Sequence, residues 1–125
     1  MTDFMQRTTS SKVQVADWQG NEPQASCVAG AVITITPSGN FRLLRISLNF
    51  DGVVAPTVNI EQVNQAGAAW NQNIRNVAVP APAAGNTDYT LIGGQGYEYR
   101  QGDSIQVTIS AVAANVNCSW AMEQI

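Results

Sequence analysis

The chain has 125 residues, of which 45% are hydrophobic and 12% are charged, and its formal net charge is -3. This length fits one domain with one hydrophobic core, and the apolar fraction excludes wholesale disorder. The six Lys and Arg residues are scattered and outnumbered by nine Asp and Glu residues, which argues against binding to nucleic acid.

Neutral amides replace the missing charges, because the chain has eleven Asn and eleven Gln residues. A surface of this kind repels its neighbours weakly. We expect it in a protein that packs against copies of itself or against a larger assembly; drift toward an amide-rich composition is the alternative. The uncharged stretch from Cys27 to Ile35 is too short to span a membrane. The start, MTDFMQRTTSSK, lacks the apolar core of a secretory signal, which predicts a protein made in a cytoplasm.

In chain order, residues 1–11 are polar and without periodicity, and predict a flexible N-terminal arm ahead of a single domain at 12–125. Lys12–Ala16 alternates and predicts a short strand. The segment Asp17–Ser26 holds Gly, Asn and Pro and is typical of a loop. Ala31–Thr36 is β-branched and predicts a strand that a Pro-Ser-Gly-Asn turn closes.

The next segment, Phe41–Phe50, predicts a strand with Leu44, Ile46, Leu48 and Phe50 on its buried face. Further strands are predicted at Thr57–Val63, Trp70–Val79, Asp88–Ile92, Ser104–Ala111 and Asn117–Ile125. No segment has helical periodicity with caps. Short strands with turns every eight to twelve residues predict an all-β sandwich or small barrel.

Nothing in the sequence has the pattern of a catalytic, metal or cofactor site, so we expect a protein that is not an enzyme. The absence of histidine excludes Ser-His and Cys-His pairs and argues against zinc. The acidic residues are spread out, without the acid spacing of a calcium loop. We interpret Gly102-Asp103 as a tight turn whose carboxylate bonds nearby backbone amides.

Aromatic residues in or beside loops are the candidate partner contacts, namely Trp18, Tyr97 and Tyr99. Such rings stack on sugars or fill a partner's pocket. Core packing is the alternative for all three, and it is the favoured interpretation for Trp70 and Trp120.

The region from Phe41 to the C-terminus carries a recognisable order of segments. FRLLRISLNF is followed by VNIEQV, by a Gly-Ala-Ala stretch that ends in Trp70, by Thr-Asp-Tyr and by RQGDSIQV. This order resembles a loose family of small phage virion proteins that fold as jelly-roll sandwiches, with a Gly-Asp turn before the penultimate strand. Gly102 and Asp103 match that turn. The family supplies no catalytic residues.

The resemblance implies an antiparallel β-sandwich of jelly-roll type with about eight strands. It implies a virion protein without membrane or nucleic-acid contacts: a capsid decoration or cement protein, oligomeric as a trimer or dimer, that contacts the major capsid protein. The arm would order on docking by pairing with a neighbour's sheet edge. The alternative function is a carbohydrate- or receptor-binding module of a tail or head fibre.

Two cysteines, Cys27 and Cys118, are predicted to be buried thiols rather than a disulfide, because no secretory signal is seen. If paired, they would close a loop of about 90 residues and stabilise the fold by about 4 to 5 kcal/mol. A jelly roll often places its first and last core strands side by side. This placement predicts that the Cys27 region lies near Cys118.

Overall fold

The structure of the protein is a computed structural model, which describes the backbone of residues 12–15 and the backbone and side chains of residues 18–93 and 98–125. The predicted N-terminal arm, residues 1–11, lies outside the described residues. Its role in docking therefore stays a prediction.

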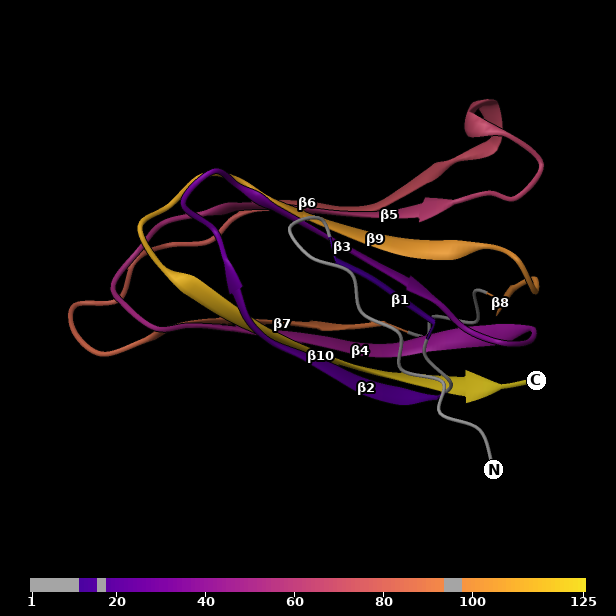
Figure 1. The fold of residues 1–125 in the computed structure, drawn as a ribbon, viewed down its shortest axis with the longest axis horizontal. Helices are drawn as coiled ribbons and strands as arrows, with labels where there is room; N and C mark the ends of the chain where they lie inside the picture. Colours follow the sequence, from indigo (N-terminus) through magenta and orange to yellow (C-terminus); the bar gives the residue numbers. More distant parts are fainter. Residues whose placement is uncertain (1–11, 16–17, 94–97) are drawn as a thin grey trace.

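Strands dominate the described residues, and they form two sheets that pack face to face (Figure 1). One sheet has the order β1-β3-β9-β5-β6, and the other has the order β2-β10-β4-β7, with β8 also paired to β4. The strands are β1 (Lys12–Val15), β2 (Gln19–Ser26), β3 (Ala31–Thr36), β4 (Phe41–Phe50), β5 (Thr57–Val63), β6 (Gln72–Ala78), β7 (Thr87–Ile92), β8 (Glu98–Tyr99), β9 (Ser104–Ile109) and β10 (Asn115–Gln124).

The pairing of these strands is that of a jelly roll. Antiparallel pairs are nested along the chain, with β2 on β10, β3 on β9, β4 on β7 and β5 on β6. Nested pairs of this kind arise when one long antiparallel ribbon is rolled into two layers. The prediction of an all-β antiparallel sandwich of jelly-roll type with about eight strands is therefore confirmed, with eight strands in the nested pairs. Two short strands are added to it: β1 runs parallel to β3 at a sheet edge, and β8 extends the β7 side of β4.

Two-residue alternation sends one side of each core strand into the space between the sheets. In β10 the predicted inward face is confirmed, because Cys118, Trp120 and Met122 are all buried. In β9 the buried face is as predicted, but the strand ends at Ile109, so Ala111 lies beyond it and is exposed. Other buried members of the core are Ile33, Ile35, Phe41, Leu43, Ile46, Leu48, Phe50, Val58, Ile60, Ile105 and Val107.

The predicted loop at Asp17–Ser26 is wrong over most of its length, because β2 pairs with β10 from Gln19 to Ser26. Pro23 and Gln24 form a bulge in β2 opposite the Val116/Cys118 step, and Gln24 has a φ of 59°. A strand at a sheet edge accommodates both proline and a bulge, because its outer backbone groups have no ladder to maintain. The turn-forming residues therefore shape the strand instead of ending it.

Leu44 was predicted to be buried, and the structure places it on the outside with 39% of its surface exposed. Its neighbour Leu43 is buried instead. The register explains the change, since Arg45 pairs with Ala121 and Leu43 pairs with Met122, which leaves Leu44 as the extra residue of a bulge. One inserted residue moves all the following positions to the opposite face.

Trp70 is also outside, contrary to the favoured core interpretation. It ends a short 3-10 helix, Ala68–Trp70, and β6 starts only at Gln72. With 66% of its surface exposed, the side chain contributes little to the core. Trp120, in contrast, is fully buried as predicted.

The neighbouring strands β2 and β10 bring the two cysteine regions together, as predicted. The backbone N–H of Cys27 donates to the carbonyl of Ala114 at 2.9 Å, four residues before Cys118. Both cysteines are free thiols and both are buried. The sandwich is thus held by its core and its ladders, without a disulfide between these two residues.

Candidate contact surfaces

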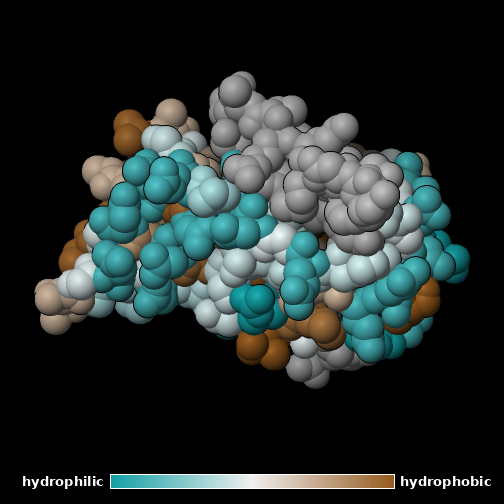
Figure 2. All heavy atoms as spheres, turned by 60° about the horizontal axis from the view of Figure 1, so that its bottom comes forward, coloured by the Kyte–Doolittle hydropathy of each residue, from teal (hydrophilic) through white to brown (hydrophobic). Residues whose placement is uncertain are grey.

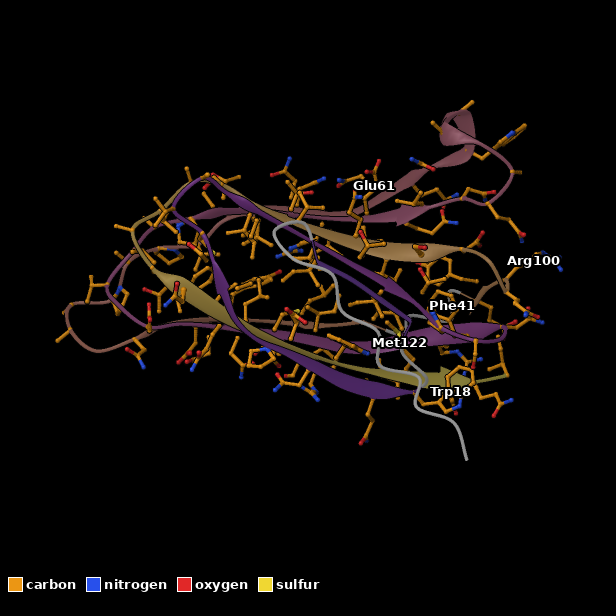
Figure 3. The ribbon with its side chains drawn as sticks, in the orientation of Figure 1. Trp18, Phe41, Glu61, Arg100 and Met122 are labelled. Atoms are coloured by element: carbon orange, nitrogen blue, oxygen red, sulfur yellow. The ribbon has the colours of Figure 1, made fainter. Side chains whose placement is uncertain are left out.

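Of the three predicted contact residues, one is buried, one is half-buried and one lies outside the described part of the chain. Tyr99 is only 8% exposed, and its ring lies against that of Phe41 with centroids 5.3 Å apart. Pairing of β8 with β4 turns this ring into the core, so the core alternative holds for Tyr99. Trp18 is half-buried and packs against the core at the end of the molecule where β10 ends (Figure 3). Tyr97 lies outside the described residues.

One end of the sandwich is built by four connections that the jelly-roll topology brings together. They join β2 to β3, β4 to β5, β6 to β7 and β9 to β10, and they gather at the left of Figure 1. We call this surface the loop end, and it consists of residues 27–30, 51–56, 79–86 and 110–114.

The loop end is almost free of charge and is made of small residues. Its segments are CVAG, DGVVAP, VPAPAAGN and SAVAA, in which Asp51 is the single ionisable carboxylate. Val28 is 70% exposed and Val53 is 50% exposed. In Figure 2 tan and brown residues lie at the left end among teal ones, and further brown patches lie at the lower centre and right. A hollow of about 640 Å³ lies at the loop end, lined by residues 28–32 and 108–111 with Ser26.

Backbone hydrogen bonds join these four loops in two pairs. The carbonyl of Cys27 accepts from the N–H groups of Gly30 and Val112, both at 2.9 Å, which joins the first loop to the fourth. The N–H of Val79 donates to the carbonyl of Pro56 at 2.9 Å, which joins the second loop to the third. The loop end is therefore a pre-formed surface that has little conformational entropy to lose on docking.

Polar side chains in and beside the loop end bond to neighbouring backbone groups. The carboxylate of Asp51 accepts from the backbone N–H of Asn115 at 2.7 Å and from its side-chain amide at 3.2 Å. The hydroxyl of Thr87, which is buried, donates toward the carbonyls of Gly52 and Val54 and accepts from the N–H of Val54 at 3.0 Å. Asp51, Asn86 and Ser110 stay exposed, so the outward surface of the loop end combines these polar groups with apolar side chains such as Val28 and Val53.

The opposite end carries a projecting hairpin that bears Trp70. We call residues 64–71, between β5 and β6, the Trp70 hairpin; it extends past the sheets at the upper right of Figure 1. The side chain of Asn64 accepts from the N–H of Ala66 at 2.8 Å, and the side chain of Asn71 accepts from the N–H of Asn64 at 2.8 Å. Backbone bonds from Gly67 to Asn64 and from Trp70 to Gly67 complete the turn.

Asp103 clamps this hairpin to the turn before β9. Its carboxylate accepts from the N–H of Gln65 at 3.0 Å, from the N–H of Arg100 at 3.1 Å and from the amide of Gln62 at 3.1 Å. The preceding Gly102 has a φ of 98°, a region that glycine enters without steric cost. The turn interpretation of Gly102-Asp103 is therefore confirmed.

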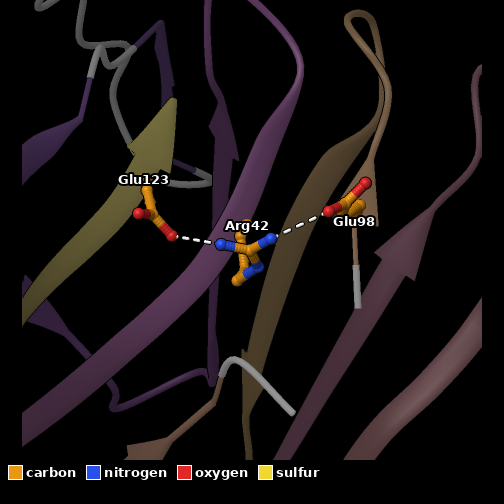
Figure 4. Close-up of polar contacts among 3 residues, drawn as sticks. All are labelled: Arg42, Glu98 and Glu123. Carbon is orange, nitrogen blue, oxygen red and sulfur yellow. Dashed lines mark hydrogen bonds and ion pairs between the residues drawn. The ribbon is translucent and has the colours of Figure 1, made fainter. Parts of the chain in front are cut away.

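The outer sheet faces present neutral side chains in rows across the strands. On the β2-β10-β4-β7 sheet, Ser119 pairs with Ser47 and Ser47 with Thr90, and the side chain of Asn49 donates to Asp88. The main charged group on this face is an ion-pair cluster, in which Arg42 on β4 lies between Glu98 on β8 and Glu123 on β10 (Figure 4). Exposed pairs of this kind add little stability.

The two buried thiols have raised pKa values and low reactivity. Burial, with a smaller contribution from the negative charge of Asp51, raises the pKa of Cys27 to about 11. Burial and the nearby Glu22 raise the pKa of Cys118 to about 12. The nucleophilic thiolate is therefore a minor species at neutral pH.

The part of the chain that the structure describes contains neither a metal-binding cluster nor a membrane-spanning helix. Among residues 12–15, 18–93 and 98–125, no group of three or more His, Cys, Asp or Glu side chains is arranged to hold a metal ion. Within the same residues, no helix has the length and apolar character to cross a membrane.

Comparison with known proteins finds a similar solved structure but no matching protein family. No family model matches the chain, and no curated protein matches it. The fold is similar to part of a solved CocE/NonD family hydrolase from Staphylococcus aureus, with a TM-score of 0.43 and 6% sequence identity. That alignment covers 94% of this chain and 33% of the hydrolase, so this chain spans about a third of that protein's length. A likeness of this size carries no argument about activity.

Sequence reasoning missed both surfaces that the structure shows. The small apolar loops were visible as Val-, Ala-, Pro- and Gly-rich segments, but only the strand order shows that they share one end. The signal for Trp70 was the Ala-Gly-Ala-Ala run before it, which supplies no partner side chains for burying an indole.

Proposed function

We propose that the protein is a non-catalytic structural component of a phage virion, a decoration protein that docks on the head through its loop end. The observation that carries the proposal is the loop end itself, a layer of small side chains with a single carboxylate, Asp51, and with Val28 and Val53 exposed on its surface. The resemblance in the sequence to small virion proteins supports the setting, and the jelly-roll fold is compatible with it.

Physical reasons favour this end as the docked surface. Apolar side chains held in a pre-formed layer gain from burial without an ordering cost, which suits contact with a large, rigid partner. The sides of the sandwich instead carry hydroxyls and amides, as on Ser47, Ser119 and Asn49, and those groups remain well hydrated beside neighbouring copies. The low net charge lets many copies crowd on one shell without strong repulsion.

The experiment is a co-sedimentation assay with heads purified from the phage whose genome carries the gene. We expect the wild-type chain to sediment with the heads at a fixed copy number. The double variant Val28→Asp/Val53→Asp should bind at least about tenfold more weakly, because two carboxylates without partners would be buried.

The matched control is Ile92→Asp, because Ile92 is 68% exposed at the far end of β7 from the loop end. This variant should bind as the wild type does. Binding that survives the double variant, or that fails equally in the control, contradicts docking through the loop end. Location of the gene away from any capsid or portal gene contradicts the virion assignment itself.

A further inference from the structure

Trp70 is the most exposed aromatic side chain that the structure describes. Phe41, Phe50 and Trp120 are fully buried and Tyr99 nearly so, whereas Trp70 leaves 66% of its surface in solvent. An exposed indole forgoes the large gain from burial that aromatic rings obtain in a core. An aromatic in this position is typical of a residue that is covered by a ligand or partner.

The hairpin holds the indole in place before any ligand arrives. Its turn is fixed by the Asn64 and Asn71 side-chain bonds and by backbone bonds from Trp70 to Gly67 and from Asn71 to Ala68, at 3.0 and 3.1 Å. Asp103 adds the anchor through the N–H of Gln65. A ring carried on a pre-organised turn loses little entropy on binding, which raises affinity for a given contact area.

The groups around Trp70 define the chemistry of the ligand. No charged residue occurs between Glu61 and Arg75 in the sequence, and the segment holds six amide side chains, Gln62, Asn64, Gln65, Asn71, Gln72 and Asn73. Gln72 and Asn73, which follow the indole after Asn71, are exposed; the Asn73 side-chain amide donates to the side-chain oxygen of Asn59, which leaves its own oxygen and second N–H for a ligand. Amides both donate and accept hydrogen bonds, as sugar hydroxyls do, and the indole face packs on the apolar side of a pyranose ring.

A hollow adjoins these groups. It has a volume of about 400 Å³ and is lined by Gln72, Asn73, Ile74 and Tyr99. A sugar chain that stacks on Trp70 can place its next unit against exposed amides rather than in open solvent. The residues just before the indole, Ala66 to Ala69, are small and exposed.

We propose that the Trp70 hairpin is a binding site for neutral hexose glycans, with the indole as the stacking platform and Gln72 and Asn73 as hydrogen-bonding groups. The hairpin lies at the opposite end of the sandwich from the loop end (Figure 1). The site therefore goes beyond the proposed docking function and is independent of it. A chain docked through its loop end presents Trp70 outward.

The test measures binding of maltohexaose, cellohexaose, laminarihexaose and a β-1,4-linked galacto-oligosaccharide to the full chain by isothermal calorimetry and by acrylamide quenching of tryptophan fluorescence. We expect at least one probe to bind and to shield Trp70 from acrylamide. Trp70→Ala should weaken binding at least about tenfold and Trp70→Phe much less, since phenylalanine retains a stacking face.

Folding does not confound this test, because Trp70 packs little surface and the urea midpoint of Trp70→Ala should match that of the wild type. Ile92→Ala is the matched control, another exposed hydrophobic residue, and should bind the probes normally. Failure of all four probes to bind, or equal binding by Trp70→Ala, overturns the glycan site. Loss of head binding in Trp70→Ala without any sugar binding also overturns it and assigns the indole to a protein contact.

Discussion

Replacing Asp103 by alanine tests whether a single carboxylate holds the end of the sandwich together. The carboxylate accepts three N–H groups from two segments that are far apart in the sequence: those of Gln62 and Gln65 around the end of β5, and that of Arg100 in the turn before β9. Asp103 itself is 4% exposed and Gln62 is 3% exposed, so water replaces this pair of partners poorly. Asp103→Ala should therefore destabilise the protein without changing its fold.

The magnitude follows from the three bonds. A hydrogen bond to a charged group contributes about 1.5 to 3 kcal/mol, and the buried bond from Gln62 is assigned a value in that range. The amides of Gln65 and Arg100 are only part-buried, so water compensates in part and each contributes about 1 kcal/mol. The sum is about 4 kcal/mol, which lowers the urea midpoint by about 2 M at an m-value of about 2 kcal/mol/M.

The assay is equilibrium urea unfolding followed by tryptophan fluorescence and circular dichroism. Asp88→Ala is the control, because Asp88 is exposed and accepts a single side-chain bond from Asn49. We expect a change within about 0.5 kcal/mol for this control. A loss below about 1 kcal/mol for Asp103→Ala would refute the clamp.

Two further predictions concern the interior. Gly20→Ala should lower the free energy of unfolding in urea by about 1 to 3 kcal/mol, because a Cβ at Gly20 would lie 2.2 Å from the ring of Trp120. The control is Gly52→Ala, which should be near neutral because a Cβ at Gly52 has no neighbour within 4 Å. Equal effects of the two variants would contradict close packing of Gly20 against Trp120. Neither Cys27 nor Cys118 should react with Ellman's reagent at pH 8 until the protein is unfolded, and rapid reaction of the native protein would count against buried thiols. In the folded protein the pKa of Cys27 is about 11 and that of Cys118 about 12, both above the ordinary value of 9.0. The stability that comes from keeping the thiols neutral is therefore present below pH 9 and is lost as the pH rises toward the folded pKa values. Urea midpoints measured between pH 8 and 10.5 should fall accordingly.

Alternation in the sequence was sufficient to place most strands. Residues 31–36, 41–50 and 57–63 were predicted with the bounds that the structure has, because apolar and polar residues alternate over most of each segment and turn residues flank them. The inward face of β10 also followed from alternation. These are segments in which local pattern and tertiary pairing agree.

The misses arise where pairing overrides the local pattern. The sequence of β2 predicts a loop because it contains Gly20 and Pro23. It forms a strand because β10 pairs with it along its length, and its position at the sheet edge tolerates the bulge. Leu44 was misplaced because a bulge is defined by the opposite strand, and nothing within β4 marks it. Such features depend on register, which a single strand does not encode.

For the contact surfaces, too, local sequence is informative only where it agrees with the tertiary pairing. The sequence predicts contact residues from their nearness to loops. This rule is wrong for Tyr99, because the two-residue strand β8 turns its ring inward. The loop end needs the jelly-roll order to exist as one surface, since its four segments are spread from residue 27 to residue 114. The resemblance to jelly-roll proteins predicted the fold but not that these four segments form one surface.

A reconstruction by electron cryomicroscopy of phage heads coated with the wild-type chain tests the central claim, that this sandwich works by contact through its loop end. We predict density for the two sheets standing on the shell, with Val28 and Val53 at the shell side and the Trp70 hairpin at the outer side. A head whose shell carries no such density, or one on which a polar sheet face lies against the shell, would contradict the account.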